Sequence, residues 1–160
     1  MYTEKNYLDK SHAELVKKVK TLSENGGDKE ALYRELLDSL TTNVAKEEVL
    51  LYPLMKYLKC RGDKHCAEQL GLISNNAYFF SKARDSMQQV MESMMKLVQK
   101  LEKGANQGSD ESLTLRELRE HLEIDNAFVY PAGMGAKALL LHDMDLQEWM
   151  KALLSHDTGT

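Results

Sequence analysis

The stretch "NVAKEEVLLYP", Asn43 to Pro53, returns as "HLEIDNAFVYP", His121 to Pro131, and this repeat decides the interpretation of the chain. In each copy an acid follows the first residue by four positions, and a tyrosine and a proline close the stretch at identical offsets. Residues four apart lie on the same face of a helix. The two copies therefore predict two helices that each present a polar donor and a carboxylate side by side.

The composition favours a helical protein without nucleic-acid or membrane partners. A chain of 160 residues fits one domain with a buried core, and 42% hydrophobic residues with only two prolines exclude disordered and collagen-like classes. The net charge of −4 is spread along the chain without a basic stripe that would neutralise phosphates. No apolar run approaches the ~20 residues of a membrane span, and the first residues lack an apolar signal region. We therefore expect a cytoplasmic protein.

Four turn-forming stretches divide the chain into four long segments and a tail. They contain glycine, proline or aspartate and lie at residues 25–28, 61–63, 103–110 and 131–136. Helices are predicted over residues 3–24, 29–59, 64–102 and 111–129. In the tail, Asp143 or Asp145 is expected to cap a short helix over residues 146–154.

Three further aspartates and two cysteines lie next to these turns. Asp28, Asp63 and Asp110 each follow glycine or serine and precede a periodic run, so each is predicted to cap a helix N-terminus. Cys60 and Cys66 are too few for a disulfide scaffold. We expect two ordinary semi-buried cysteines, in agreement with a reducing compartment, and a disulfide only if the turn brings their Cα atoms within about 7 Å.

Each segment has a stripe of residues spaced by three and four that is typical of a bundle helix. Every stripe includes a polar side chain among the apolar ones. Burying an unpartnered carboxylate costs several kcal/mol, so such groups persist only when they bond one another or bind a metal. The predicted stripes are Leu8, His12, Leu15, Val19, Leu22; Leu32, Leu36, Leu40, Asn43, Glu47, Leu50, Leu54; Ile73, Asn76, Phe80, Ala83, Met87, Val90, Met94, Leu97, Leu101; and Leu118, His121, Asp125, Phe128.

The predicted architecture is all-α: an up-down-up-down four-helix bundle with an additional C-terminal helix. Residues 1–132 form the bundle, and residues 133–160 form a tail that packs across one end. The tail carries Trp149 and Leu153 on one face. This face is expected either to be buried or to bind a partner protein.

Two carboxylates on different helices, each four residues after a polar donor, are the arrangement that a dinuclear iron or manganese site in a bundle requires. Together with the early histidine and a donor in the third helix, the repeat resembles the hemerythrin-like HHE cation-binding family over residues 5–132. The resemblance implies a non-heme di-iron site with a role in oxygen binding, oxygen sensing or iron handling. By position it implies that His12 and His121 are ligands, that Glu47 and Asp125 are bridging acids, and that Asn43 and Asn76 occupy histidine positions.

The two asparagines depart from the pattern of that family. Asn43 and Asn76 offer a neutral amide oxygen in place of an imidazole nitrogen. Phe80 occupies a position where some members of the family have one more histidine. Two ions would each keep one histidine plus shared carboxylates, which is a poor shell for di-iron.

Three interpretations of the polar residues stay open. In the first, His12, Glu47, His121 and Asp125 bind iron or manganese as a mononuclear or depleted dinuclear centre. In the second, no metal binds and the asparagines bond the acids in a polar core. In the third, the pairs face solvent and form no site.

The expected function is a metal-binding or sensing module that uses iron, with dioxygen as a further ligand. The alternative is a metal-free structural or regulatory bundle that binds a protein partner through its C-terminal helix. No Ser-His-Asp or Cys-His arrangement and no glycine-rich phosphate loop occurs, so an enzyme is not expected. An iron-dependent oxidase or peroxidase would need two ions or an open coordination position.

Overall fold

The computed structural model describes the backbone of residues 4–157 and the side-chain environment of residues 11–148 and 150–155. Throughout the described backbone the regular elements are helical and no strand occurs, which confirms the all-α class. None of the helices in this range is long and apolar enough to cross a membrane.

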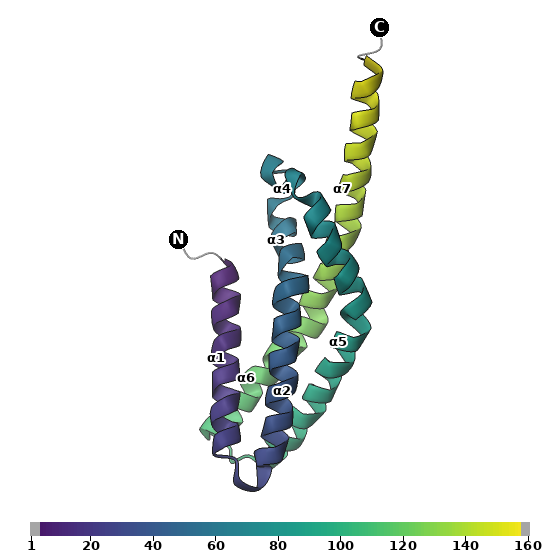
Figure 1. Ribbon diagram of the computed structural model, residues 1–160. Coiled ribbons are helices and arrows are strands. Elements are labelled where there is room, and N and C mark those ends of the chain that lie inside the picture. Colours follow the sequence, from purple (N-terminus) through teal and green to yellow (C-terminus); the bar gives the residue numbers. More distant parts are fainter. Residues whose placement is uncertain (1–3, 158–160) are drawn as a thin grey trace.

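The helices follow one another with short connections (Figure 1). A 3₁₀ turn, η1 (Gly27–Lys29), precedes α2, and two π-helical segments, η2 (Glu47–Leu51) and η3 (Asp125–Val129), join α2 to α3 and α6 to α7. The α-helices are α1 (Glu4–Glu24), α2 (Glu30–Lys46), α3 (Tyr52–Cys60), α4 (Lys64–Glu68), α5 (Leu70–Gly104), α6 (Asp110–Ile124) and α7 (Tyr130–Asp157).

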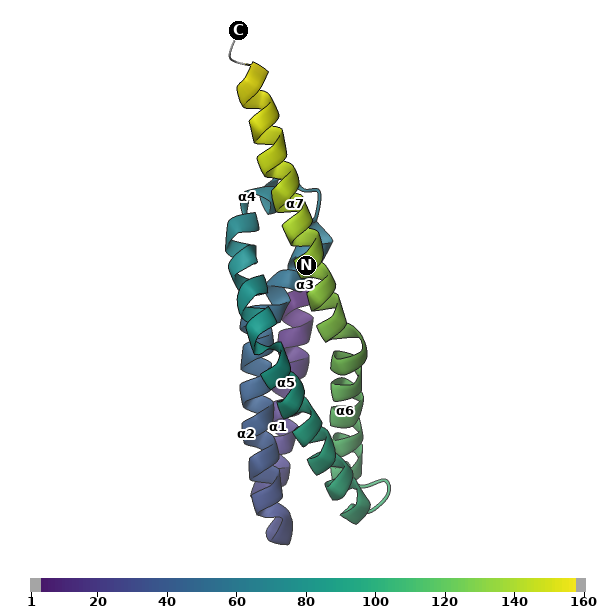
Figure 2. The same ribbon diagram turned by 90° about the vertical axis from the view of Figure 1, so that its right-hand side faces the viewer.

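The long helices enclose one apolar core. Helix α1 contacts α2 and α6, and α5 contacts α2, α6 and α7, so the packing closes into a ring. The two views show these helices lying lengthwise, with α7 continuing beyond α4 at one end (Figure 2). Each fully buried aliphatic side chain contributes about 1.5–3 kcal/mol to stability. Such side chains include Val19 of α1, Leu36 and Leu40 of α2, Leu54 of α3, Met94 and Val98 of α5, Leu115 and Leu118 of α6, and Leu140 of α7.

Three of the four predicted turns separate helices, but the stretch at 131–136 does not. Helix α7 runs unbroken from Tyr130, so the prediction of a separate tail helix over 146–154 is wrong. Pro131 lies at the start of α7, where a missing N–H group is tolerated. A Cβ on Gly133 would lie 2.4 Å from Leu51 Cδ1 and 2.9 Å from Phe80 Cε1. Glycine therefore permits a close approach of α7 to η2 and α5.

One of the three predicted aspartate caps is confirmed. Asp63 accepts a hydrogen bond from the His65 backbone N–H at 2.9 Å and caps α4. Asp28 lies in η1 and caps nothing, and Ser109 rather than Asp110 caps α6. Ser109 has the extended backbone that a cap requires, whereas Asp110 is already helical.

The junction after α3 contains a disulfide. Cys60 and Cys66 are bonded with their Cα atoms 5.7 Å apart, which meets the distance condition for a disulfide and corrects the expectation of two ordinary cysteines. The tight turn at Arg61–Asp63 brings the cysteines within the distance that a disulfide spans. Asp143 of α7 packs here and accepts hydrogen bonds from Tyr57 and Arg61, so it does not cap a tail helix.

Candidate metal centre

The two sequence repeats adopt the same backbone irregularity. Each acid begins a π segment, and the backbone N–H of Tyr52 or Tyr130 donates to the carbonyl of Glu47 or Asp125, five residues earlier. Proline follows each tyrosine. Short π segments within α-helices are frequent at functional sites.

The extra residue in each π segment shifts the helical register and overturns part of the predicted stripes. Leu51 is fully buried and Leu50 only half-buried, whereas Leu50 was predicted to face inward. Phe128 was also predicted to face the core and is 70% exposed. Tyr130 takes the inward position in that repeat. A regular 3.6-residue period extended through the repeat therefore misplaces Leu50 and Phe128, although Leu54 is buried as predicted.

Five of the six predicted polar residues meet inside the molecule. His12 comes from α1, Asn43 from α2, Glu47 from η2, His121 from α6 and Asp125 from η3. The side chain of His121 is 17% exposed, and the other four residues are buried. The third interpretation, in which the histidine and acid pairs face solvent, is therefore wrong in its placement of these side chains.

Asn76 does not join the other five. It is half-buried on α5, and its amide donates to the Leu72 carbonyl of its own helix at 3.4 Å. The buried stripe of α5 passes instead through Ile73, Ala77 and Phe80. From Ile73, an inward stripe can advance by three or by four residues, and the packing selects the smaller, apolar Ala77.

In the first repeat, Glu47 is held by hydrogen bonds. Its Oε1 atom accepts from Asn43 Nδ2 at 2.7 Å and from the Tyr130 hydroxyl at 3.0 Å. The same hydroxyl lies 3.1 Å from Asn43 Oδ1, so its single proton is shared between two acceptors. Tyr130 therefore belongs to the site, although the sequence indicated it only as a matching position in the repeat.

The imidazole of His12 contacts the tyrosine and the acid of the first repeat through its two nitrogens. His12 Nδ1 lies 2.6 Å from the Tyr52 hydroxyl, and His12 Nε2 lies 3.6 Å from Glu47 Oε2. A metal-binding histidine commonly donates its other ring N–H to an oxygen, which fixes the ring orientation. Tyr52 can accept this proton and leave the Nε2 lone pair directed toward Glu47. Tyr52 is thus a second site residue that the sequence analysis did not assign.

In the second repeat, the donor and the acid contact each other. His121 Nε2 and Asp125 Oδ2 lie 3.0 Å apart and form an ion pair when the imidazole is protonated, and neither buried atom has a further hydrogen-bond partner. When the imidazole is neutral and its Nε2 carries no proton, two acceptors face each other without a donor, which costs about 1–3 kcal/mol for a buried polar atom. A cation that bonds both atoms would remove this cost.

The electrostatics of the centre favour protonation when no cation is present. Burial raises the pKa of Glu47 to about 8, and the nearby negative charge of Asp125 acts in the same direction. Burial alone would lower the pKa of His121, but the Asp125 carboxylate beside it, with Glu47, raises it. Without a cation the buried site therefore limits its negative charge by binding protons, and a metal ion would replace those protons as the counter-charge of the carboxylates.

The donor set fits a first-row transition ion. The nearest ligand atoms of His12, Glu47 and His121 all lie within 4.8 Å of one another. Asp125 adds a carboxylate oxygen next to His121. Two imidazoles with carboxylates suit iron, manganese or zinc.

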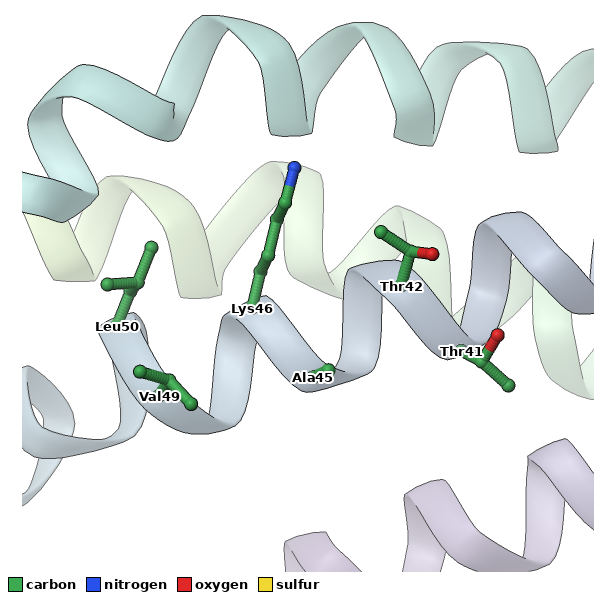
Figure 3. Close-up of a pocket in the computed structure, with 6 residues that line it drawn as sticks. All are labelled: Thr41, Thr42, Ala45, Lys46, Val49 and Leu50. Atoms are coloured by element: carbon green, nitrogen blue, oxygen red, sulfur yellow. The ribbon is translucent and has the colours of Figure 1, made fainter.

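A separate hollow lies on the outside of α2 and η2. It is lined by Thr41, Thr42, Ala45, Lys46, Val49 and Leu50 (Figure 3). Asn43 and Glu47 are buried on the opposite side of this stretch. The hollow has no acid or histidine in its lining, so it is not part of the metal centre.

No family model, curated protein or solved structure matches the chain. The hemerythrin-like family therefore stays an expectation from the repeat. The function is inferred from the geometry of the chain's own residues.

Proposed function

We propose that the chain is a metal-binding module of the hemerythrin-like type, an up-down-up-down four-helix bundle that binds iron or manganese in its core. The ligands are His12, Glu47, His121 and Asp125. The observation that carries the proposal is the buried cluster in which ligand atoms of His12, Glu47 and His121 lie within 4.8 Å of one another, with Asp125 Oδ2 3.0 Å from His121 Nε2 and without a further hydrogen-bond partner. A cation would balance the carboxylates and bond both atoms of the pair.

The remaining residues hold and orient these ligands. Tyr52 contacts His12 Nδ1 and sets the direction of the imidazole. Asn43 and Tyr130 fix the Glu47 carboxylate through its Oε1 atom. Burial of the cluster excludes water from all sides except that of His121, whose side chain is partly exposed. A bound iron would supply the capacity to bind dioxygen, and a role in sensing oxygen or iron follows from that.

The test is metal binding by the whole chain. Chelator-stripped protein is titrated anaerobically with Fe(II) and separately with Mn(II), and the metal content after desalting is measured by elemental analysis. We expect retention of metal by the wild type and loss of metal in Glu47→Gln and Asp125→Asn. These amides keep the shape of the acids, so circular dichroism should show folded proteins.

An exposed histidine provides the matched control. His142 lies on the surface of α7, and His142→Ala should leave the metal content unchanged. Equal metal content in the wild type and in both site variants would contradict the proposal.

A second candidate function is supported by the far part of α7. Leu146, Met150 and Leu153 are spaced by four and three residues and are 44%, 57% and 49% exposed. This face suits a metal-free bundle that binds a partner protein through its last helix. The predicted contribution of Trp149 lies outside the described side chains. No retained metal after loading, with a melting temperature unaffected by chelator, would favour this function.

A further inference from the structure

The two oxygens of Glu47 have different surroundings. Oε1 accepts from Asn43 Nδ2 at 2.7 Å and from the Tyr130 hydroxyl at 3.0 Å. Oε2 lies on the side of His12, 3.6 Å from its Nε2 atom. A carboxylate that bridges two ions through both oxygens offers one oxygen to each. Here Oε1 already accepts from two protein donors, which compete with an ion for that oxygen.

The space around Tyr130 is filled by hydrocarbon. The Phe80 ring packs edge-on against the Tyr130 ring with their centroids 6.2 Å apart, and both side chains are buried. Gly133 brings the backbone of α7 against Phe80 and Leu51, so closely that even a Cβ would collide with them. This region offers a second ion neither room nor a histidine.

The other repeat supplies ligand atoms that no further protein group occupies. His121 Nε2 and Asp125 Oδ2 lie 3.0 Å apart without another hydrogen-bond partner, and the His12 and His121 rings meet edge to face with centroids 4.9 Å apart. The nearest ligand atoms of His12, Glu47 and His121 lie within 4.8 Å of one another, and Asp125 joins this group through its contact with His121. Asn76, from the remaining long helix, bonds its own backbone instead.

We infer that the site takes a single metal ion, and that Asn43 and Tyr130 determine this number by occupying Glu47 Oε1. The inference rests on the proposed function and specifies it further. Asn43 and Tyr130 are positioning residues, because they act on the ion through the Glu47 carboxylate. Glu47 then contributes through Oε2 alone and does not bridge.

The experiment counts ions in the full chain. Chelator-stripped wild-type protein is titrated with Mn(II) under anaerobic conditions, and the bound equivalents are measured by calorimetry and elemental analysis. Electron paramagnetic resonance distinguishes the isolated six-line signal of one Mn(II) from the broadened signal of a coupled pair. We expect one equivalent and the six-line signal for the wild type. The variant Asn43→His with Tyr130→Phe frees Oε1 and adds an imidazole, so it should bind a second equivalent.

The control variant Thr42→His adds a histidine to the exposed side of the same helix and should leave the stoichiometry at one. Two coupled ions in the wild type would overturn the single-ion inference while the proposed function stands. A folded double variant that still binds one ion would overturn the role of Asn43 and Tyr130. A wild type that binds no Mn(II) or Fe(II) would overturn the proposed function and the inference with it. If the double variant is unfolded, the wild-type stoichiometry decides the number of ions.

Discussion

The two copies of the repeat share a backbone and differ in what completes their carboxylates. Both run from a polar residue through an acid into a π segment closed by Tyr-Pro. In the first copy, the Glu47 oxygen Oε1 is bonded by Asn43 and Tyr130. In the second copy, His121 Nε2 and Asp125 Oδ2 lie 3.0 Å apart and have no further hydrogen-bond partner. The first copy thus surrounds its acid with hydrogen-bond donors, whereas the acid and the imidazole of the second copy contact only each other at these atoms.

The two copies therefore share their backbone geometry and differ in the groups that contact the acid. The π segments and prolines set the direction of the acid in either copy, whatever residue opens the repeat. One change of donor, from imidazole to amide, converts a ligand into a hydrogen-bond donor for the neighbouring carboxylate. The predictions below test this asymmetry between the copies.

The largest effect is expected from removing the opening residue of each copy in turn. His121→Ala should weaken Mn(II) binding by about a thousandfold because it removes a ligand, whereas Asn43→Ala should weaken it by about tenfold because it only loosens Glu47. Isothermal titration calorimetry at one pH gives both values. Equal losses in the two variants would mean that the copies are equivalent in the site.

The metal-free protein should become less stable as the pH rises from about 5 to above 8. The pKa of Glu47 is raised from 4.5 to about 8, chiefly by burial, so the folded state holds its proton where the unfolded state has lost it. The raised pKa of His121 acts in the same direction. Stability falls with rising pH wherever the folded state binds more protons than the unfolded state, and the shift of Glu47 corresponds to a loss on the order of 5 kcal/mol.

Urea unfolding of chelator-treated protein across this pH range measures the effect. Glu47→Gln removes the ionisation of Glu47 and should weaken the dependence of stability on pH. His142→Ala should leave that dependence unchanged. A stability of the metal-free wild type that rises between pH 5 and pH 8 would contradict the assignment of Glu47 as a buried, protonated acid.

Gly133 tests the packing beside the first copy. Gly133→Ala places a methyl group 2.4 Å from Leu51 Cδ1 and should cost about 2 kcal/mol through overpacking. Gly135→Ala is the matched control, since a Cβ there meets nothing within 4 Å, and alanine should be neutral or slightly stabilising in a helix. The two melting temperatures give the comparison, and equal values would mean that α7 does not approach η2 and α5 as described.

The smallest effect is expected from the tyrosine hydroxyl of the second copy. Tyr130→Phe removes hydrogen bonds to Glu47 and Asn43 and should lower the free energy of unfolding by about 1 kcal/mol. Tyr78→Phe changes an exposed hydroxyl on α5 and serves as the control. Urea unfolding at constant pH measures both, and no difference between them would remove Tyr130 from the site.

The helices and most of the site were predictable because they depend on local spacing. The 3.6-residue period located the helices, and the i to i+4 spacing placed the opening residues and acids of the repeat on inward faces. Asn76 was misplaced because a stripe can advance by three or four residues, and only packing decides between them. The register shift that exposes Phe128 arises from a π segment, which has no simple signal in apolar periodicity.

Two further features depend on tertiary structure. The roles of Tyr52 and Tyr130 arise from contacts between residues 40 or more positions apart. The Cys60–Cys66 bond depends on the path of the turn between α3 and α4, which spacing alone does not define.

The most direct test of the central claim is a crystal structure of the Mn(II)-loaded protein with anomalous diffraction data. The account predicts one anomalous peak per chain, within about 2.5 Å of His121 Nε2 and of an Asp125 oxygen, with Glu47 Oε1 still bonded to Asn43 and Tyr130. A chain with no peak among these residues, or with two peaks bridged by both oxygens of Glu47, would contradict it.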